Sequence, residues 1–250
     1  MEGPSLLLAA QQLAPFKKKK ILEVHGNTKI GKERLANKKI KDIFSWGKHL
    51  VFQFDTFALR VHFMLYGSFQ ATVKDKKVTG DYPTKNKPTR LCLTLPNGHI
   101  EMYNCSLRFI ELPNAIDTYD FTISIMSPLF DSKKALVTLK SHPNRQISDG
   151  LLDQAIFAGV GNIIRNEVLF RTKILPDAIV KDLSQKKLKE IIQTTQEYVV
   201  QFYEWRKRFE LKKHYQIYRQ STCPKCSGKV MRKRTGEYKR ISFFCPSCQS

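Results

Sequence analysis

The feature that most constrains the fold is a set of four cysteines near the C-terminal end of the sequence. They form two Cys-x-x-Cys pairs separated by 18 residues: Cys223 with Cys226, and Cys245 with Cys248. This spacing is typical of two knuckles that enclose one tetrahedral zinc ion through four thiolates. A disulfide framework would need an oxidising compartment, and the sequence shows no secretory signal. We therefore predict a zinc finger over residues 221–250, whose Zn²⁺ is structural because four cysteines leave no open coordination position.

The sequence carries a large excess of positive charge, concentrated toward its C-terminal end. The formal net charge is +21, and residues 206–250 hold 13 Lys/Arg against two Glu. A basic surface kept for solubility normally intersperses both signs, so this density favours a polyanionic partner, nucleic acid before membrane. No apolar run approaches the length of a membrane span. We expect a globular protein of the cell interior, in the cytoplasm, nucleoid or nucleus, without a membrane partner.

Strand-like and helical patterns occupy different parts of the sequence. A helix is expected over residues 4–16, and helical periodicity returns after Pro128. Strands first and helices later indicate a two-lobed α+β protein joined near residues 120–130, with a ligand between the lobes. Short β-branched and aromatic runs predict a β-sandwich or barrel, and they cover residues 21–24, 41–44, 50–54, 58–63, 90–95, 100–103 and 108–112. The later helices are expected over residues 132–140, 146–157, 162–170 and 184–203.

A long motif in the helical half, residues 151–170, contains Ala-Gly-Val-Gly-Asn ending at Asn162. The two glycines let a backbone approach a phosphate closely, and Asn162 opens a helix whose free N–H groups attract anions. Taken alone, this segment could equally be a structural helix cap. The whole motif closely resembles the helix–two-turn–helix signature of the formamidopyrimidine-DNA glycosylase and endonuclease VIII family.

Three further segments resemble motifs of this family in the same order along the chain. They are Met1-Glu2-Gly3-Pro4, Trp46-Gly47-Lys48-His49-Leu50, and Arg240 placed five residues before Cys245. The resemblance implies an N-terminal β-sandwich catalytic domain with an N-terminal helix (1–125), a helix–two-turn–helix domain (126–220) and a zinc finger (221–250). It also implies a monomer that binds double-stranded DNA containing damaged bases or abasic sites and flips out a base. No organic cofactor is expected.

The resemblance assigns catalytic roles to three residues. The family's nucleophile is an N-terminal proline amine, and here Met1 stands in its place. An α-amine is partly unprotonated near neutrality and can attack the sugar C1′ to form a Schiff base. Three explanations stay open: a natural variant that uses a primary amine, a chain altered to abolish catalysis, and a sequence record that mislays one residue. Glu2 would act as general acid and base, and Lys48 would hold the phosphate beside the target nucleotide, although Lys48 taken alone reads as a surface turn lysine.

The resemblance also assigns DNA contacts. Leu65 is the candidate wedge that fills the hole left by the flipped base, with Tyr66 beside it. The alternative is that Met64 and Leu65 belong to the core of the β-sandwich. Asn162 and Arg240 would clamp the DNA backbone, Arg240 through its planar fork. Arg165 and Glu167 are assigned only to support of the site.

The sequence is compatible with two functions of this family and with a third, unrelated one. The leading one is a glycosylase and abasic-site lyase that removes oxidised bases, pyrimidines in preference to purines. The rival is a DNA-damage binder of the same fold with impaired or no catalysis, because the N-terminal proline is absent. A third reading, an unrelated zinc-finger transcription factor, leaves Glu2, Lys48 and Asn162 unexplained.

Overall fold

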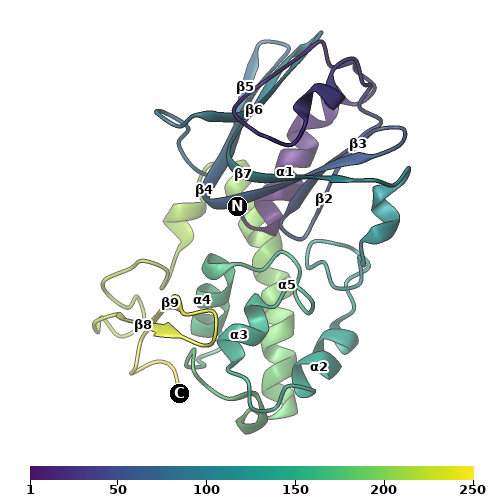
Figure 1. Cartoon of the computed structure of the whole chain (residues 1–250). Helices are drawn as coiled ribbons and strands as arrows, with labels where there is room; N and C mark the ends of the chain where they lie inside the picture. Colours follow the sequence, from purple (N-terminus) through teal and green to yellow (C-terminus); the bar gives the residue numbers. More distant parts are fainter. The chain divides into compact units, whose positions relative to one another are not determined.

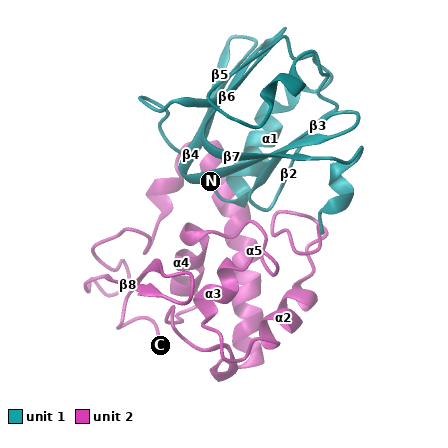
Figure 2. Ribbon diagram, viewed as in Figure 1, with its two compact units in different colours: residues 1–120 teal, residues 121–250 magenta.

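The computed structural model describes all 250 residues, which form two compact units. Unit 1 comprises Met1–Asp120 and unit 2 comprises Phe121–Ser250 (Figure 2). Each unit has a hydrophobic core of its own. None of the helices combines the length and the apolar character that a membrane crossing requires.

Unit 1 begins with helix α1 (Gly3–Leu13), which has a proline in its first turn, where the missing N–H has no helical partner to lose. The helix stops before the predicted limit at residue 16. A 3-10 turn, Ala14–Phe16, completes the segment, and its proline explains the change because it cannot donate a helical hydrogen bond. The apolar face of α1 packs against β2 (Asp42–Trp46) and β3 (His49–Gln53).

The strands of unit 1 form one continuous antiparallel sheet in the order β1-β6-β7-β4-β3-β2, with β5 paired to β4 (Figure 1). The other strands are β1 (Glu23–His25), β4 (Ala58–Val73), β5 (Lys76–Thr79), β6 (Thr89–Leu95) and β7 (Gly98–Ile110). The first half of β4 pairs with β3 and its second half with β5. The predicted β lobe is confirmed, and its two halves are joined because β4 and β7 run through both of them.

Strand β7 is longer than either of the runs predicted within it. Residues 100–103 and 108–112 appeared separate in the sequence because polar residues lie between them. In the structure one strand runs through the segment, but its buried positions change from even-numbered residues (Ile100, Met102) to odd-numbered ones (Cys105, Leu107) next to Asn104, whose φ is 46°.

Unit 2 contains the predicted helices. Asp131 and Ser184 cap α2 (Ser132–Lys140) and α5 (Gln185–Lys207) by accepting backbone N–H groups of the first turn. Helix α4 (Asn162–Arg171) agrees closely with its prediction.

Helix α3 (Ile147–Leu152) is much shorter than the predicted 146–157. It ends because Asp153 adopts an extended backbone. The side chain of Asp153 then accepts the backbone N–H of Ala155 at 2.8 Å, which stabilises a turn instead of another helical turn.

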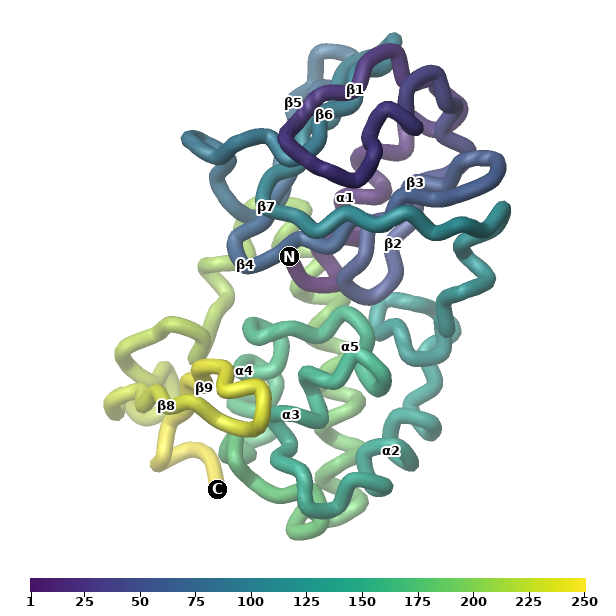
Figure 3. The backbone as a smooth tube through the Cα atoms, in the orientation of Figure 1, coloured from purple at the N-terminus to yellow at the C-terminus, as the bar shows by residue number.

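The C-terminal segment forms a hairpin of β8 (Met231–Thr235) and β9 (Arg240–Phe244). Strand β9 lies alongside α4 (Figure 3). A small separate core holds this segment together and includes one residue of α4; its buried members are Phe170, Ile217, Cys223, Val230 and Cys245.

Candidate functional site

The first residues of the chain lie against the core of unit 1. The Met1 side chain is half-buried and packs on that core, and Glu2 is buried. The backbone carbonyl of Glu2 accepts the N–H of Leu6 at 3.1 Å, so Glu2 already belongs to the helical hydrogen-bonding pattern at the start of α1. The helix therefore fixes the position of the α-amine.

Lys48 lies in the tight turn between β2 and β3. Trp46 and His49 are cross-strand partners, which leaves Gly47 and Lys48 as a two-residue turn. Gly47 has φ 50°, in the left-handed region that glycine enters without steric cost. The glycine thus makes the turn tight enough to present Lys48 at its tip.

Charged groups of unit 1 gather around the α-amine. Burial lowers the pKa of the Met1 amine below its ordinary value of 8.0; the charges of Asp81 and Glu2 oppose the shift, and the charge of Lys48 reinforces it. The pKa of His62 is lowered by burial first, and then by the charges of Lys48 and of the amine. The structure therefore brings together the three residues predicted as catalytic, and adds a carboxylate and an imidazole.

Asp81 and His62 were missed by the sequence analysis. Asp81 follows β5 and comes from a segment that folds back on β4: Gly80 donates its N–H to the Phe69 carbonyl at 2.8 Å, and Tyr82 donates its N–H to the Ser68 hydroxyl at 3.3 Å. No local sequence signal predicts such a long-range return. His62 lies in a strand, and there a single polar residue predicts only a side chain on the solvent-facing side of the strand.

An aromatic cluster supports the Lys48 turn. The ring of His49 lies 5.6 Å from that of Trp46 and 5.9 Å from that of Tyr119, measured between centroids. The indole N–H of Trp46 donates to the Asp120 carbonyl at 2.9 Å. Burial, with the charge of Arg60, lowers the pKa of His49 to about 4. The imidazole is therefore neutral at physiological pH and packs in the cluster as an uncharged ring.

The predicted wedge lies on an irregularity of β4, where the pairing with β7 shifts between Phe63 and Ser68. Met64, Leu65 and Tyr66 are exposed, Leu65 at 60%, so they do not belong to the core. A Cβ on Gly67 would clash with the backbone carbonyl of Asn104, which explains the glycine.

Side chains outside this bulge bind its backbone carbonyls. Asn104 donates to the Leu65 carbonyl at 2.8 Å, and Lys87 donates to the Tyr66 carbonyl at 2.7 Å. Tyr66 has a left-handed backbone with φ 61°, and its ring meets that of Tyr82 edge to face. The bulge, residues 64–67, therefore has a defined shape and presents Leu65 outward.

In unit 2, Asn162 is the first residue of α4, and Gly161 precedes it as the N-cap. The Asn162 side chain donates to the carbonyl of Ile241 at 3.1 Å. Ile241 directly follows Arg240, the exposed first residue of β9. The structure therefore places the two predicted clamp residues close together, one at a helix N-terminus and one on the hairpin beside it.

Two buried charged residues of α4 hold the surrounding chain. Arg165 donates to the Ile241 carbonyl at 3.0 Å and to the Ser242 hydroxyl at 2.8 Å. The carboxylate of Glu167 accepts backbone N–H groups from the segment that precedes the finger: Gln216, Ile217 and Tyr218. Both side chains are buried, and their hydrogen bonds fix the positions of β9 and of residues 216–218.

A residue of α3 holds the turn between β8 and β9 in place. Asp149 is buried and accepts the N–H of Glu237 at 2.7 Å. A Cβ on Gly236 would clash with the Asp149 carboxylate, and Gly236 also has φ 66°. At the other end of the turn, Arg145 donates to the Tyr238 hydroxyl at 3.2 Å.

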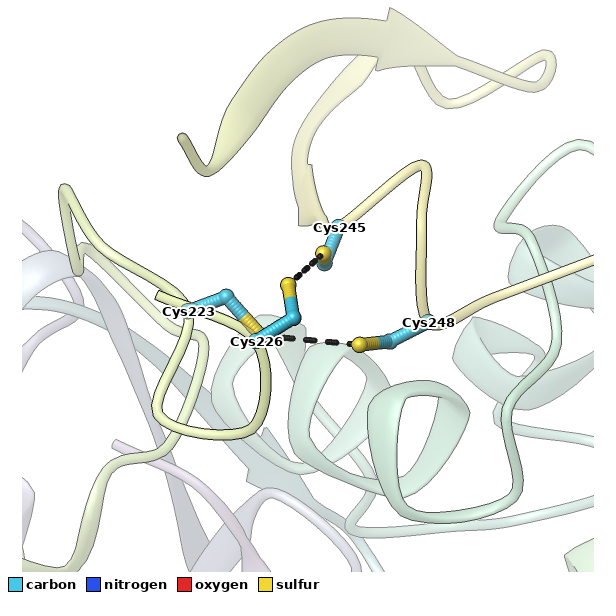
Figure 4. Close-up of side chains that lie close together, drawn as sticks. All are labelled: Cys223, Cys226, Cys245 and Cys248. Atoms are coloured by element: carbon cyan, nitrogen blue, oxygen red, sulfur yellow. Dashed lines mark hydrogen bonds between the residues drawn. The ribbon is translucent and has the colours of Figure 1, made fainter. Parts of the chain in front are cut away.

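The four predicted ligand cysteines come together at the base of the hairpin (Figure 4). Their sulfur atoms all lie within 4.8 Å of one another. The Cys223–Cys248 and Cys226–Cys245 sulfur distances are 3.8 Å and 3.5 Å. Bonds of about 2.3 Å to a tetrahedral zinc require sulfur atoms about 3.8 Å apart. The four thiols could therefore hold a metal ion, and their geometry fits zinc.

Comparison with known proteins agrees with this arrangement. Residues 4–112 match the model of the formamidopyrimidine-DNA glycosylase N-terminal domain, and residues 126–204 match that of the formamidopyrimidine-DNA glycosylase H2TH domain. The chain belongs to the formamidopyrimidine-DNA glycosylase and endonuclease VIII family. The relatives place it nearer the endonuclease VIII branch.

Within this family, endonuclease 8-like 3 of Mus musculus is 32% identical over 209 residues, which cover 81% of this chain and 33% of the relative. The chain thus spans about a third of the length of that relative. Endonuclease 8 of Salmonella arizonae is 26% identical over 267 residues, 99% of both chains. The crystal structure of a viral DNA glycosylase shares the fold over 100% of both chains, with a TM-score of 0.82 at 23% identity.

Proposed function

We propose that this chain is a base-excision-repair DNA glycosylase with abasic-site lyase activity, directed at oxidised bases and at pyrimidines in preference to purines. The observation that carries the proposal is the buried α-amine of Met1, whose pKa is lowered and which has Lys48 and two carboxylates as electrostatic neighbours. A lowered pKa makes the amine a better nucleophile near neutral pH. Membership of a family of DNA glycosylases supports the same conclusion.

The neutral α-amine attacks C1′ of the sugar, and the bond from C1′ to the base breaks; the base leaves with the bonding electrons and takes up the proton that the attacking nitrogen releases. Glu2 protonates the ring oxygen, so the ring opens as the amine nitrogen loses its protons and forms the Schiff base. The Glu2 carboxylate, which gave its proton to the ring oxygen, then accepts a proton from C2′; the bond from C3′ to oxygen breaks, the 3′ phosphate leaves and the strand is cleaved. Lys48 binds the phosphate of the target nucleotide and stabilises the charge that develops there.

The partner is double-stranded DNA that contains a damaged base or an abasic site, bound by one protein monomer. A related fold, formamidopyrimidine-DNA glycosylase of Lactococcus lactis, has been crystallised with DNA containing an abasic site. In this chain Leu65 fills the space left by the flipped base, with Tyr66 beside it. Asn162 and Arg240 contact the DNA backbone through an amide, a guanidinium and the free N–H groups of a helix N-terminus.

The metal in the finger is a structural Zn²⁺ held by the four cysteines, and no organic cofactor takes part. Zinc bound to the purified chain should approach one ion per molecule. Cys245→Ser should lose the metal and weaken DNA binding, because Arg240 lies on the hairpin that the metal site anchors. Cys105→Ser changes a buried cysteine outside the cluster and is the matched control.

Borohydride trapping on abasic-site DNA tests the chemistry. We expect a covalent adduct between the N-terminal residue and the DNA, which mass spectrometry of the digested adduct locates. The mass of the intact chain must be measured on the same sample, because a residue before Glu2 other than Met1 would change the nucleophile. Intact DNA binding without an adduct would favour the rival function, a damage binder without catalysis. In that case a proline inserted before Glu2 should restore trapping.

A further inference from the structure

The end of α5 presents an exposed aromatic ring in an unusual backbone conformation. Phe209 is 73% exposed, the largest exposed fraction among the large hydrophobic residues, and its φ is 62°. Its N–H donates to the Arg206 carbonyl at 3.1 Å, and the N–H of Glu210 donates to the Trp205 carbonyl at 2.8 Å. This pair of hydrogen bonds is the Schellman motif, in which the left-handed residue is usually glycine.

Phenylalanine is unfavourable at this position on two grounds. A left-handed backbone crowds a residue that has a Cβ, so glycine would relieve strain here. The ring also gains little from burial, because most of it faces solvent. Neither backbone conformation nor core packing explains Phe209, and an exposed aromatic group held in this way fits a contact with a ligand.

Neighbouring residues hold the chain on both sides of Phe209 in place. The indole of Trp205 stacks on the imidazole of His214, with centroids 4.2 Å apart and an angle of 8° between the planes. Leu211 is buried in the core of unit 2. The guanidinium of Arg206 lies 5.3 Å from the centroid of the Phe209 ring. The chain on both sides of Phe209 is therefore anchored.

Positively charged residues flank Phe209 along the chain. Residues 206–213 contain five Lys/Arg and one Glu. Lys207, Arg208, Lys212 and Lys213 are exposed. Arg208 and Lys213 pair at the surface with Glu204 at 3.7 Å and Glu210 at 3.3 Å, and phosphates would compete for these two cations. Cations that flank an exposed aromatic ring suit a nucleic-acid strand, because phosphates meet the cations while a base stacks on the ring.

We propose that Phe209 is a stacking platform for an unpaired nucleobase, on a DNA strand whose phosphates contact the surrounding cations. The inference rests on the proposed DNA-binding function and adds a site to it. The site consists of residues of unit 2, whereas the Leu65 bulge belongs to unit 1, and it holds a base that has left the duplex without being the substrate of excision.

The test compares two labelled 12-nucleotide strands, oligothymidylate and a strand of the same length built from abasic tetrahydrofuran residues. Both carry the same phosphates, and only the first can stack. Fluorescence anisotropy should show about tenfold tighter binding of oligothymidylate by the unchanged protein. Phe209→Asn should remove most of this preference, because asparagine tolerates the left-handed backbone but offers no ring. Phe209→Trp should keep it.

Lys173→Asn is the matched control. Lys173 occupies the same left-handed position after α4: its N–H donates to Phe170 and the next N–H donates to Leu169. This variant should leave the preference for oligothymidylate over the abasic strand unchanged. Thermal unfolding should show that Phe209→Asn is at least as stable as the unchanged protein. Equal binding of the two strands by the unchanged protein, or a preference that survives Phe209→Asn, would overturn the stacking site while leaving duplex binding intact. Failure to bind duplex DNA would instead contradict the proposed function.

Discussion

The carboxylate of Glu167, fully buried in α4, accepts the backbone N–H of Ile217 at 2.9 Å. It also accepts the N–H groups of Gln216 and Tyr218, so one side chain orients three consecutive peptides. Glu167→Gln removes the charge and puts a donor where an acceptor is needed. We expect the free energy of unfolding to fall by about 2 kcal/mol, measured by urea denaturation. Glu197→Gln, an exposed change on α5, should have almost no effect.

Gly236→Ala should displace the hairpin turn, because the new methyl group meets the Asp149 carboxylate and the backbone has a positive φ. Hydrogen exchange should become faster in β8 and β9. In an Asp149→Ala background, Gly236→Ala should accelerate hydrogen exchange in β8 and β9 by a smaller factor, because the clash with the carboxylate is then absent. Equal effects in the two backgrounds would show that backbone strain alone disfavours alanine.

Arg240→Ala should weaken duplex binding about equally for all sequences, because a phosphate contact carries no base information. The slope of log K against log salt should fall by about one unit. Lys233→Ala is a useful comparison, because Lys233 on the same hairpin forms an ion pair with Asp177 at 2.6 Å. If the salt slope of Arg240→Ala equals that of the unchanged protein, Arg240 does not contact a phosphate.

The rate of borohydride trapping should rise with pH as the Met1 amine loses its proton. Because burial lowers the pKa of this amine, the midpoint should lie below 8.0. The charge of Asp81 raises that pKa, so Asp81→Asn should move the midpoint to lower pH. A midpoint that stays in place would show that Asp81 does not act on the nucleophile.

Unit 1 should lose stability in mild acid through His49. Its pKa is about 4 in the folded state and 6.5 ordinarily, so between these values the unfolded chain binds a proton that the folded chain does not. The free energy of unfolding should therefore decrease as the pH falls from 6.5 to 4. His49→Gln should flatten this dependence, whereas His25→Gln, which changes an exposed histidine, should leave it in place.

The sequence predicted the cluster of four cysteines and the general order of elements because both depend on local spacing. Cys-x-x-Cys pairs, strand alternation and helical periodicity all act over a few residues. The errors occurred where tertiary contacts override local pattern. The run at 100–103 and residues 108–110 of the second run belong to one strand, β7, and α3 ends at Leu152 because the side chain of Asp153 stabilises a turn.

The candidate site was predicted only in part. Motifs indicated Met1, Glu2 and Lys48, since each lies in a recognisable segment. Asp81 depends on a chain return to Ser68 and Phe69 that no short motif encodes. Phe209 was missed for another reason: a single exposed aromatic residue is ordinary in a sequence, and only its backbone angle makes it unusual.

The backbone shape of the bulge at residues 64–67 does not depend on which side chains the bulge carries. Asn104 and Lys87 hold it through the carbonyls of Leu65 and Tyr66, and every amino acid has a carbonyl. Position 65 can therefore accept many side chains on an unchanged backbone. Under the wedge role proposed for Leu65, exchanging this one residue changes the side chain that enters the DNA and leaves the sheet that carries it unchanged.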